Sequence, residues 1–143
     1  RTLNIAKGGF AFAPALYLDG ALAHIEAMPE NTLEAIVNKY VEMNVAHPFM
    51  EGNGRSTRIW LDLILKKNLR ECVDWSQIDK QEYLNAMKIS HADSAEIKKL
   101  VKGALTDKIN DREVFMKGLD ASYHYEGYHA YQTETLDPHT DRI

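Results

Sequence analysis

The first fourteen residues show a hydrophobic pattern that differs from the pattern of the rest of the chain. Hydrophobic residues here alternate with small or polar ones on both sides of a glycine turn formed by Lys7, Gly8 and Gly9. The alternating hydrophobic residues are Leu3, Ile5, Phe10 and Phe12. Because period-two alternation around a glycine turn is typical of a β-hairpin, we predict a short hairpin flap over residues 1–14.

From residue 15 onward the pattern is helical, since hydrophobic residues recur at steps of three and four. A first helix is expected near Ala15 to Met28. Helix-capping residues followed three positions later by glutamate predict four further helix starts. These pairs are Asn31 with Glu34, Asp79 with Glu82, Asp93 with Glu96, and Asn110 with Glu113. We therefore predict an all-α domain with a helical core at 15–109, a C-terminal helix at 110–128 and a loosely held tail at 129–143.

One helix of this core should be buried on nearly every side. It begins just after Gly54, and its hydrophobic residues are spread around almost the whole helix circumference. These residues are Ile59, Trp60, Leu61, Leu63, Ile64 and Leu65. A helix that is hydrophobic all round is usually buried, so we predict a bundle packed around it. The preceding helix, which starts after Asn31, would deliver His47 at its C-terminal end.

The last predicted helix carries a carboxylate on its hydrophobic side. The stripe that begins with Phe115 and Leu119 continues at helical steps through Ser122 to Glu126. An inward-facing glutamate is costly unless it has a partner. One interpretation is that the helix frays before Ser122, so that Glu126 is solvated and the next residue, Gly127, is only a helix cap. The other is that Glu126 pairs with Arg58, a cation that we expect in a pocket.

Length and charge limit the classes of function. The chain has 143 residues, of which 45% are hydrophobic and 27% charged, which suits one soluble domain with a single core. A formal net charge of −4 argues against a general nucleic-acid or anionic-membrane surface. The single Cys72 cannot form an internal disulfide, and we see no targeting segment or long apolar span. These features favour a reducing cytoplasm.

The stretch 47–58 concentrates groups suited to a polyphosphate and a metal. His47 is a proton acceptor at neutral pH, and Glu51 is a hard oxygen ligand suited to Mg²⁺. Glycines permit positive φ and close approach of backbone N–H groups to an anion, here before a helix N-terminus that also favours phosphate. The turn is formed by Gly52, Asn53 and Gly54, and two arginines follow at Arg55 and Arg58 on one side of the helix.

Each of these elements also has a simpler interpretation. His47 could be an ordinary residue at a helix end, the Gly-Asn-Gly sequence a plain turn, and the arginines a solvated pair. Zinc binding by His47 and Glu51 is disfavoured, because Pro48 and the glycines interrupt a continuous helix and no second histidine follows within a turn. A P-loop is excluded, since the chain has no Gly-Lys-[Ser/Thr] sequence.

The order of the groups resembles the signature of the Fic family, written HxFx(D/E)GNGRxxR, at every specified position. The resemblance implies transfer of AMP from ATP to a protein hydroxyl, with His47 as general base and Glu51 as ligand of Mg²⁺. It places Phe49 in the core as an anchor of the loop. The roles implied for the remaining motif residues are an anion hole at Gly52, Asn53 and Gly54, phosphate binding by Arg55, and γ-phosphate binding by Arg58. Gly54 favours AMP transfer over phosphate transfer, because related Doc-type kinases carry lysine there.

A second motif, from Ser122 to Gly127, is similar to the inhibitory sequence (S/T)xxxE(G/N) of many Fic proteins. Its place in the final helix resembles the short bacterial class III members. The resemblance implies that Glu126 pairs with Arg58 and keeps the γ-phosphate from its productive position. Tyr123 and Tyr128 are candidate sites of self-modification. The hairpin flap with Lys7, Gly8 and Gly9 at its tip would dock the target segment.

The sequence therefore predicts an autoinhibited, Mg²⁺-dependent protein adenylyltransferase that acts on a Tyr, Thr or Ser hydroxyl. Alternatives are transfer of another nucleotide or of phosphocholine, removal of AMP, or a non-catalytic nucleotide-binding module. The expected partners are ATP and a target protein, for which a DNA topoisomerase subunit is a family-level candidate. We expect neither nucleic acid nor membrane as a direct partner, and homo-oligomers remain open.

Overall fold

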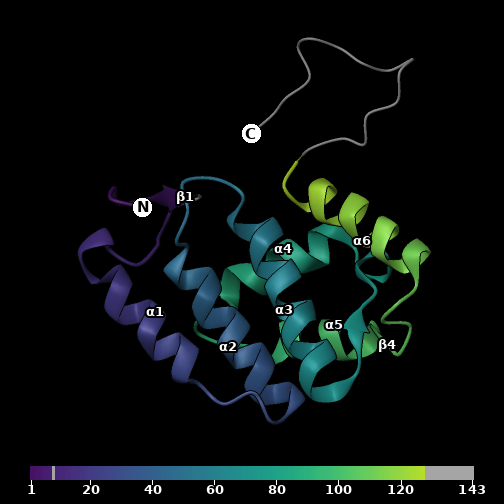
Figure 1. Ribbon diagram of the computed structural model, residues 1–143. Helices are drawn as coiled ribbons and strands as arrows, with labels where there is room; N and C mark the ends of the chain where they lie inside the picture. The colour runs from purple at the N-terminus through teal and green to yellow at the C-terminus, as the bar shows by residue number, and fades with distance from the viewer. Residues whose placement is uncertain (8, 128–143) are drawn as a thin grey trace.

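The computed structural model describes residues 1–7 and 9–127 of the chain (Figure 1). In chain order its elements are β1 (Ala6–Lys7), β2 (Phe10–Ala11), a 3₁₀ turn η1 (Ala15–Tyr17), α1 (Leu18–Ala27), α2 (Leu33–Ala46), α3 (Asn53–Leu69), β3 (Cys72–Val73), η2 (Trp75–Gln77), α4 (Lys80–Ile89), α5 (Ala95–Gly103), β4 (Leu105–Thr106) and α6 (Arg112–Tyr125). The prediction of an all-α domain with a short hairpin is therefore confirmed. Within the described residues no helix is both long and apolar enough to cross a membrane.

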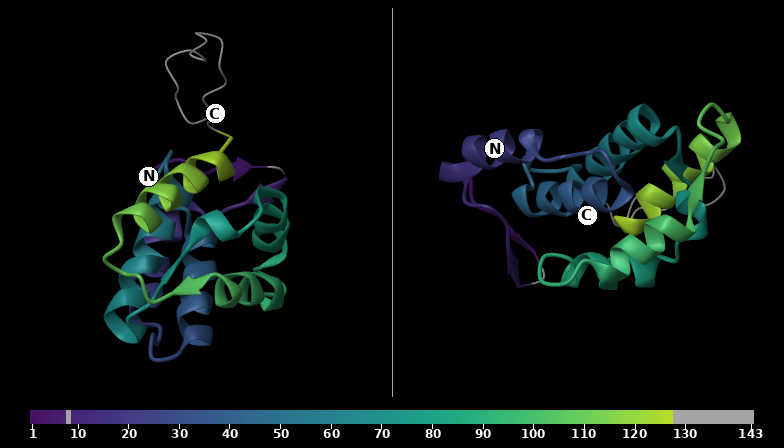
Figure 2. Two further views of the ribbon diagram at one scale, coloured as in Figure 1. Left: turned by 90° about the vertical axis from the view of Figure 1, so that its right-hand side faces the viewer. Right: turned by 90° about the horizontal axis from the view of Figure 1, so that it is seen from below.

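The helices are arranged around α3. Helix α2 packs along α3, and α1 covers the outer side of α2. On the other side α4 and α5 pack together, and α6 lies across α3, α4 and η2. Figures 1 and 2 show this order, with the hairpin and α6 at the same end of the molecule. That end is where α2 finishes and α3 begins.

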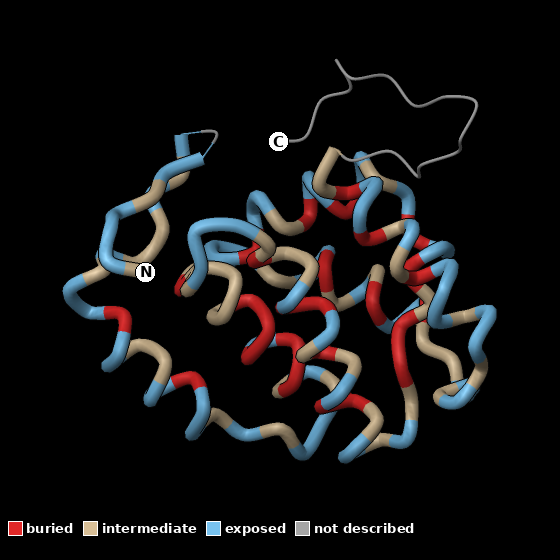
Figure 3. The backbone as a smooth tube through the Cα atoms, turned by 45° about the horizontal axis from the view of Figure 1, so that its top comes forward, coloured by how far each residue is buried: buried red, intermediate tan, exposed pale blue. Residues whose placement is uncertain are grey.

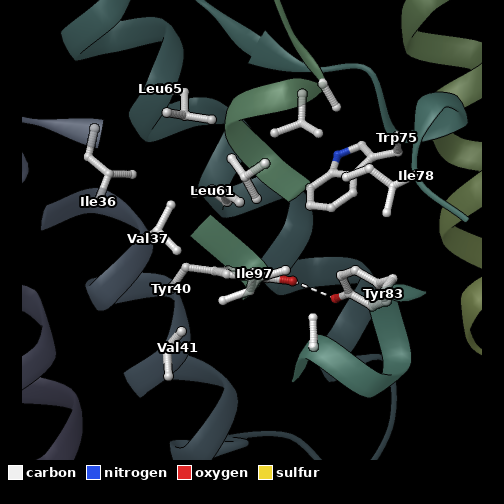
Figure 4. Close-up of a cluster of buried hydrophobic side chains, with 14 of the residues drawn as sticks. Ile36, Val37, Tyr40, Val41, Leu61, Leu65, Trp75, Ile78, Tyr83 and Ile97 are labelled. Atoms are coloured by element: carbon white, nitrogen blue, oxygen red, sulfur yellow. Dashed lines mark hydrogen bonds between the residues drawn. The ribbon is translucent and has the colours of Figure 1, made fainter. Parts of the chain in front are cut away.

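The hydrophobic core lies among α2, α3, α4 and α5. Buried residues concentrate on these central elements, whereas α1 shows mostly exposed and intermediate positions (Figure 3). The core includes Ile36 and Tyr40 of α2, Leu61 and Leu65 of α3, and Ile97 of α5 (Figure 4). A smaller cluster forms between α1 and the end of α2. The partly buried Trp60 of α3 packs against both clusters and so joins α1 to the core.

Two short antiparallel sheets accompany the helices. In the hairpin, Ala6 pairs with Ala11 and Lys7 pairs with Phe10, and Gly9 has the positive φ of 81° that the turn needs. A second pair joins β3 to β4, with Val73 opposite Leu105. The sequence analysis did not predict this pair, because strands of two residues are too short to show a period of two.

The helix starts agree with the capping pattern to within one residue. Asp79 caps α4 and accepts a hydrogen bond from the Glu82 N–H, as predicted. The expected caps at Asn31 and Asn110 are wrong by one position. Thr32 caps α2 and Asp111 caps α6, each by accepting a backbone N–H three residues later. At α5 the N-cap is Ser94, one residue after the expected Asp93.

Helix α3 is central but is not buried all round. Leu61, Ile64 and Leu65 are buried, whereas Ile59 and Leu63 point to solvent and are exposed. The prediction of burial on nearly every side is therefore wrong for one side of the helix. The hydrophobic pattern of α3 could not show that α6 covers only part of the side of α3 that carries Ile59 and Leu63.

The carboxylate of Asp62 ties α3 to the segment that follows it. One oxygen accepts the backbone N–H of Val73 at 2.8 Å, and the other accepts the indole N–H of Trp75 at 2.9 Å. Burial raises the pKa of Asp62 to about 6, so the group is ionised at neutral pH. The two donors fix β3 and η2, on which α6 rests.

We expect Asp62→Asn to lower the free energy of unfolding by about 2 kcal/mol, because the new amide group presents a donor to one of two buried N–H groups. Urea unfolding at pH 7.5 measures the change. The matched control is Asp120→Asn, since Asp120 is exposed on α6. Equal stability of both variants would contradict the structural role of Asp62.

Candidate active site

The motif 47–58 is the turn between α2 and α3. His47 closes α2 in the left-handed conformation, with a φ of 48°, and Gly52 precedes α3 with a φ of 77°. The expectation of positive φ is correct for Gly52 and wrong for Gly54, which lies inside α3 with helical geometry. The motif therefore presents the N-terminus of α3, a terminus that attracts anions.

Asn53 holds the loop by its side chain. Its Oδ1 accepts the backbone N–H of Phe49 at 2.8 Å, and its Nδ2 donates to the Phe49 carbonyl at 2.6 Å. The Asn53 side chain is buried, and its oxygen and nitrogen both bond to the Phe49 backbone, so the part of Asn53 left to bind an anion is its backbone N–H. Phe49 itself is 55% exposed, and the expectation that it anchors the loop in the core is wrong. The Asn53 amide performs this anchoring instead.

His47 is covered by the flap. The Phe12 ring stacks on its imidazole, with ring centroids 3.7 Å apart and planes within 12°. The Arg1 side chain donates to the carbonyls of His47 and Ala46, which fixes the end of α2. Burial lowers the pKa of His47 to about 4, and the charges of Arg1 and Lys7 add to this effect. The imidazole is therefore neutral at pH 7 and able to accept a proton.

Arg58 of α3 is buried, with 2% of its side chain exposed. Its Nε donates to Ser122 Oγ at 2.8 Å, and its Nη2 donates to the Ser122 carbonyl at 3.0 Å. The same Nη2 forms an ion pair with Glu126 Oε1 at 2.6 Å, and Nη1 donates to the Tyr83 hydroxyl at 2.9 Å. The guanidinium thus joins α3 to both α4 and α6.

The Glu126 carboxylate also lies directly over Gly54. A Cβ atom at Gly54 would stand 1.8 Å from Glu126 Oε1 and 2.8 Å from its Cδ. No side chain can be added at position 54 while Glu126 is in this place. The carboxylate therefore fills the space next to the N-terminus of α3.

Helix α6 reaches this place through a stripe that differs from the expected one. Phe115 is exposed, whereas Gly118, Ser122 and Tyr125 are buried. The prediction that Phe115 starts the inward stripe is wrong, because the buried side is displaced by about one residue toward Gly118. Glu126, immediately after the helix, is 21% exposed and points at Arg58.

A cavity of about 300 Å³ connects these groups. Its wall brings together the predicted residues His47, Gly54, Arg58 and Glu126. The flap contributes Lys7, Phe10 and Phe12, and α4 contributes Tyr83, Leu84, Met87 and Lys88. A neutral base, a helix N-terminus and a buried cation therefore face one space, which can hold a phosphate chain beside a proton acceptor.

Other predicted residues lie outside this cavity. Arg55 lies over the ring of Tyr123 on α6, with its Cζ 5.1 Å from the ring centroid. Together with Gly52 they line a separate groove of about 310 Å³. Gly127 follows Glu126 with a positive φ of 84°, in the place expected for a helix-ending glycine. The predictions for Gly8 and Tyr128 fall outside the described residues.

Glu51 is the candidate metal ligand. It is an exposed carboxylate in the turn that leads to the N-terminus of α3. No group of three or more His, Cys, Asp or Glu side chains suited to a metal occurs within residues 1–7 and 9–127. Mg²⁺ commonly takes one or two protein carboxylates and completes its shell with phosphate oxygens and water. The single carboxylate therefore fits a Mg²⁺ ion that arrives with a nucleotide.

The sequence analysis missed two aromatic residues of the site. Phe12 was recognised only as part of the flap pattern, and Tyr83 was not singled out. A signal for Phe12 exists in its position on the same hairpin side as Phe10, with which it packs edge to face. Tyr83 falls on the hydrophobic side of α4, so the sequence pattern does not distinguish it from an ordinary core residue.

Comparisons with known proteins show which proteins this chain resembles. The Fic/DOC family profile matches residues 1–65. The protein adenylyltransferase VbhT of Bartonella schoenbuchensis is 30% identical over 95 residues, which cover 64% of this chain and 19% of VbhT. The crystal structure of the VirB-translocated effector BepC from Bartonella tribocorum, with bound AMPPNP, gives a TM-score of 0.64 at 21% identity over 74% of this chain and 57% of that chain.

These comparisons differ in what they cover. The likeness to BepC shows the fold, a mostly helical Fic fold. The chain spans about a fifth of the length of VbhT, 19%, and the family profile ends within α3.

We expect the His47 imidazole to titrate with a pKa near 4, well below the ordinary value of about 6.5. Because the unfolded state binds this proton more readily, the neutral imidazole adds stability above about pH 6.5, and this contribution decreases as the pH falls toward 4. Histidine NMR spectra recorded against pH measure the value, with His47→Ala identifying the resonance.

Variants of the flap test whether burial under Phe12 lowers the pKa of His47. Phe12→Ala removes the stacked ring and should raise the pKa of His47 toward its ordinary value, because burial is the main cause of the shift. Phe10→Ala is the matched control and should change the pKa less, since Phe10 packs on Phe12 rather than on the imidazole. A pKa near 6.5 in the unaltered protein would contradict this account.

Proposed function

We propose that the chain is a protein adenylyltransferase of the Fic/DOC family, which moves AMP from ATP to a Tyr, Thr or Ser hydroxyl of a target protein. The observation that carries the proposal is the cavity whose wall includes neutral His47, Arg58 and Gly54 at the N-terminus of α3. The name of VbhT, a protein adenylyltransferase, supports the same activity.

In the proposed reaction the oxygen of the target hydroxyl attacks the α-phosphorus of ATP. His47 takes the hydroxyl proton as the new oxygen–phosphorus bond forms. The bond from the α-phosphorus to the bridging oxygen breaks, and its electron pair leaves with pyrophosphate. The lowered pKa of His47 supports this role, because one nitrogen of the neutral imidazole carries no proton before the reaction.

The phosphate chain of ATP is proposed to bind the part of the cavity wall that Arg58 and the N-terminus of α3 form. The N-terminus of α3 attracts the phosphates by its N–H groups and helix dipole, and Arg58 binds the γ-phosphate through its planar guanidinium. Glu51 would hold Mg²⁺, which neutralises phosphate charge when it is bound. Arg55 also serves the phosphates in this proposal, but only after its guanidinium leaves the Tyr123 ring.

Glu126 is the proposed inhibitor of this site. Its carboxylate uses one N–H group of Arg58 and occupies the space above Gly54. The γ-phosphate of ATP would compete with the Glu126 carboxylate, which is already paired with Arg58. ATP could therefore bind only with its γ-phosphate away from Arg58. Ser122 strengthens the closed arrangement with two further bonds to Arg58.

The flap is the proposed docking site of the target. Lys7 and Phe10 pair across the two strands and line the cavity, so an extended peptide added to this hairpin would place its hydroxyl near His47. Gly9 keeps the turn narrow, with a φ of 81°. A DNA topoisomerase subunit is the family-level candidate for the target.

We expect Glu126→Gly to increase AMP transfer at least about tenfold, since every ~1.4 kcal/mol of lost inhibitory coupling is a factor of ten. Incubation of each variant with Mg²⁺, α-labelled ATP and a bacterial lysate measures the transferred label. Glu126→Gln keeps a similar volume over Gly54 and should release less activity. Glu113→Gln, at an exposed site on α6, is the matched control and should leave AMP transfer unchanged.

Adding His47→Ala to Glu126→Gly should abolish labelling without unfolding the protein. Retained labelling would remove His47 from the role of base, and an unchanged rate in Glu126→Gly would remove Glu126 from the role of inhibitor. Competition with other nucleotides separates AMP transfer from the alternatives, because only ATP should displace the label efficiently. Nucleotide binding without any transfer would favour a non-catalytic module.

Self-modification is a further part of the proposal. Tyr123 of α6 is 42% exposed and lies next to the motif arginine Arg55. After incubation of Glu126→Gly with MgATP, we expect mass spectrometry to find AMP on Tyr123. Tyr123→Phe should remove that adduct, and adding His47→Ala should prevent it. Absence of AMP from every tyrosine peptide, including the peptide that carries Tyr128, would contradict this expectation.

A further inference from the structure

The hydrogen bonds of Arg58 come from two groups of partners with different positions in the fold. Ser122 and Glu126, from the C-terminal end of α6, accept three of the four side-chain hydrogen bonds described for this arginine. The fourth is accepted by the hydroxyl of Tyr83 in α4. The guanidinium carbon also lies 5.3 Å from the ring centroid of Tyr83. Tyr83 thus contacts Arg58 by both its hydroxyl and its ring.

Tyr83 is itself held in one place. Its side chain is buried, and its hydroxyl oxygen lies 2.5 Å from the hydroxyl oxygen of Tyr40 on α2 (Figure 4). Arginine can only donate, so the Tyr83 oxygen accepts from Arg58 and the proton of Tyr83 is available to Tyr40. Burial raises the pKa of Tyr40 well above its ordinary value, which keeps this phenol neutral. The order Arg58, Tyr83, Tyr40 is therefore a continuous chain of hydrogen bonds.

The two groups of partners would behave differently when the inhibitory contact is released. Removal of the end of α6 takes away Ser122, Glu126 and the ring of Tyr125, which stacks on Tyr83. Tyr83 and Tyr40 remain, because α4 and α2 belong to the main core. Without Tyr83 the freed guanidinium would lose its last described hydrogen bond and could turn away from the cavity.

We propose that Tyr83, supported by Tyr40, is a positioning residue that keeps Arg58 directed into the cavity when α6 is displaced. The inference rests on the proposed function, in which Arg58 binds the γ-phosphate. It assigns Tyr83 an effect on the binding of the terminal phosphate, because the hydrogen-bond partners described for its hydroxyl are Arg58 and Tyr40. Tyr83 therefore affects ATP binding and leaves AMP binding unchanged.

The test uses Tyr83→Phe in the Glu126→Gly protein. This change keeps the ring, with its stacking and its contact to the guanidinium, and removes only the hydroxyl. We expect the dissociation constant for MgATP, measured by titration calorimetry, to rise about tenfold, which is typical of a lost hydrogen bond to a charged group. The dissociation constant for AMP should change less than twofold. Labelling of a lysate should show a higher KM for ATP.

Two matched variants complete the experiment. Tyr125→Phe also removes a buried hydroxyl, one that donates to the carbonyls of Trp75 and Ile78, and should leave the ratio of the two dissociation constants unchanged. Tyr40→Phe removes the support of the Tyr83 hydroxyl and should weaken MgATP binding two- to fivefold without weakening AMP. If Tyr83→Phe does not fold, Tyr40→Phe decides the question.

The outcomes separate this inference from the proposed function. Equal weakening of ATP and AMP, or no weakening of either, would overturn the positioning role. The same change in the ratio of the MgATP and AMP dissociation constants in Tyr125→Phe would also overturn the positioning role. Loss of any buried hydroxyl would then have the same effect. Failure of the Glu126→Gly parent to bind ATP or to transfer AMP would count against the proposed function itself.

Discussion

The burial of one charged group, the guanidinium of Arg58, is the constraint on which this structure depends most. A charge removed from water must be paired, because an uncompensated buried charge costs several kcal/mol. The chain supplies partners from two sides of α3, with Tyr83 on α4 and Ser122 and Glu126 on α6. The position of α6 therefore follows from the need to satisfy Arg58 as much as from hydrophobic packing.

The same requirement links stability to the proposed regulation. Glu126 and a γ-phosphate are both anions suited to Arg58, and the carboxylate also fills the space over Gly54. In the proposed regulation the two anions would compete for one cation, and the resting state would need no partner from outside the chain. Ser122 and Tyr125 add contacts that an incoming phosphate cannot replace directly. Release should therefore involve the end of α6 as a unit rather than the rotation of one side chain.

Local patterns predicted much of the fold and of the cavity, but they could not predict packing between distant segments. The hairpin and the order of the motif residues depend on neighbours in sequence, and both were predictable. Helix caps were displaced by one residue where two adjacent residues can cap, as at Asn31 and Thr32. The exposure of Phe49, and the roles of Phe12 and Tyr83, depend on which surfaces meet across the chain. The hydrophobic pattern of the sequence does not distinguish an exposed aromatic residue from one that packs in the core or lines the cavity.

The flap is involved in two requirements of the proposed reaction, an unprotonated base and a bound target. A general base must be unprotonated before it can act, and the burial of His47 under Phe12 satisfies this condition at neutral pH. The segment proposed to bind the target is the same hairpin, so docking would add cover where the imidazole is already shielded from water. A target that displaced the flap would leave His47 more exposed and its pKa closer to the ordinary value. In the proposed reaction, target recognition and the protonation state of the base would therefore depend on the same hairpin.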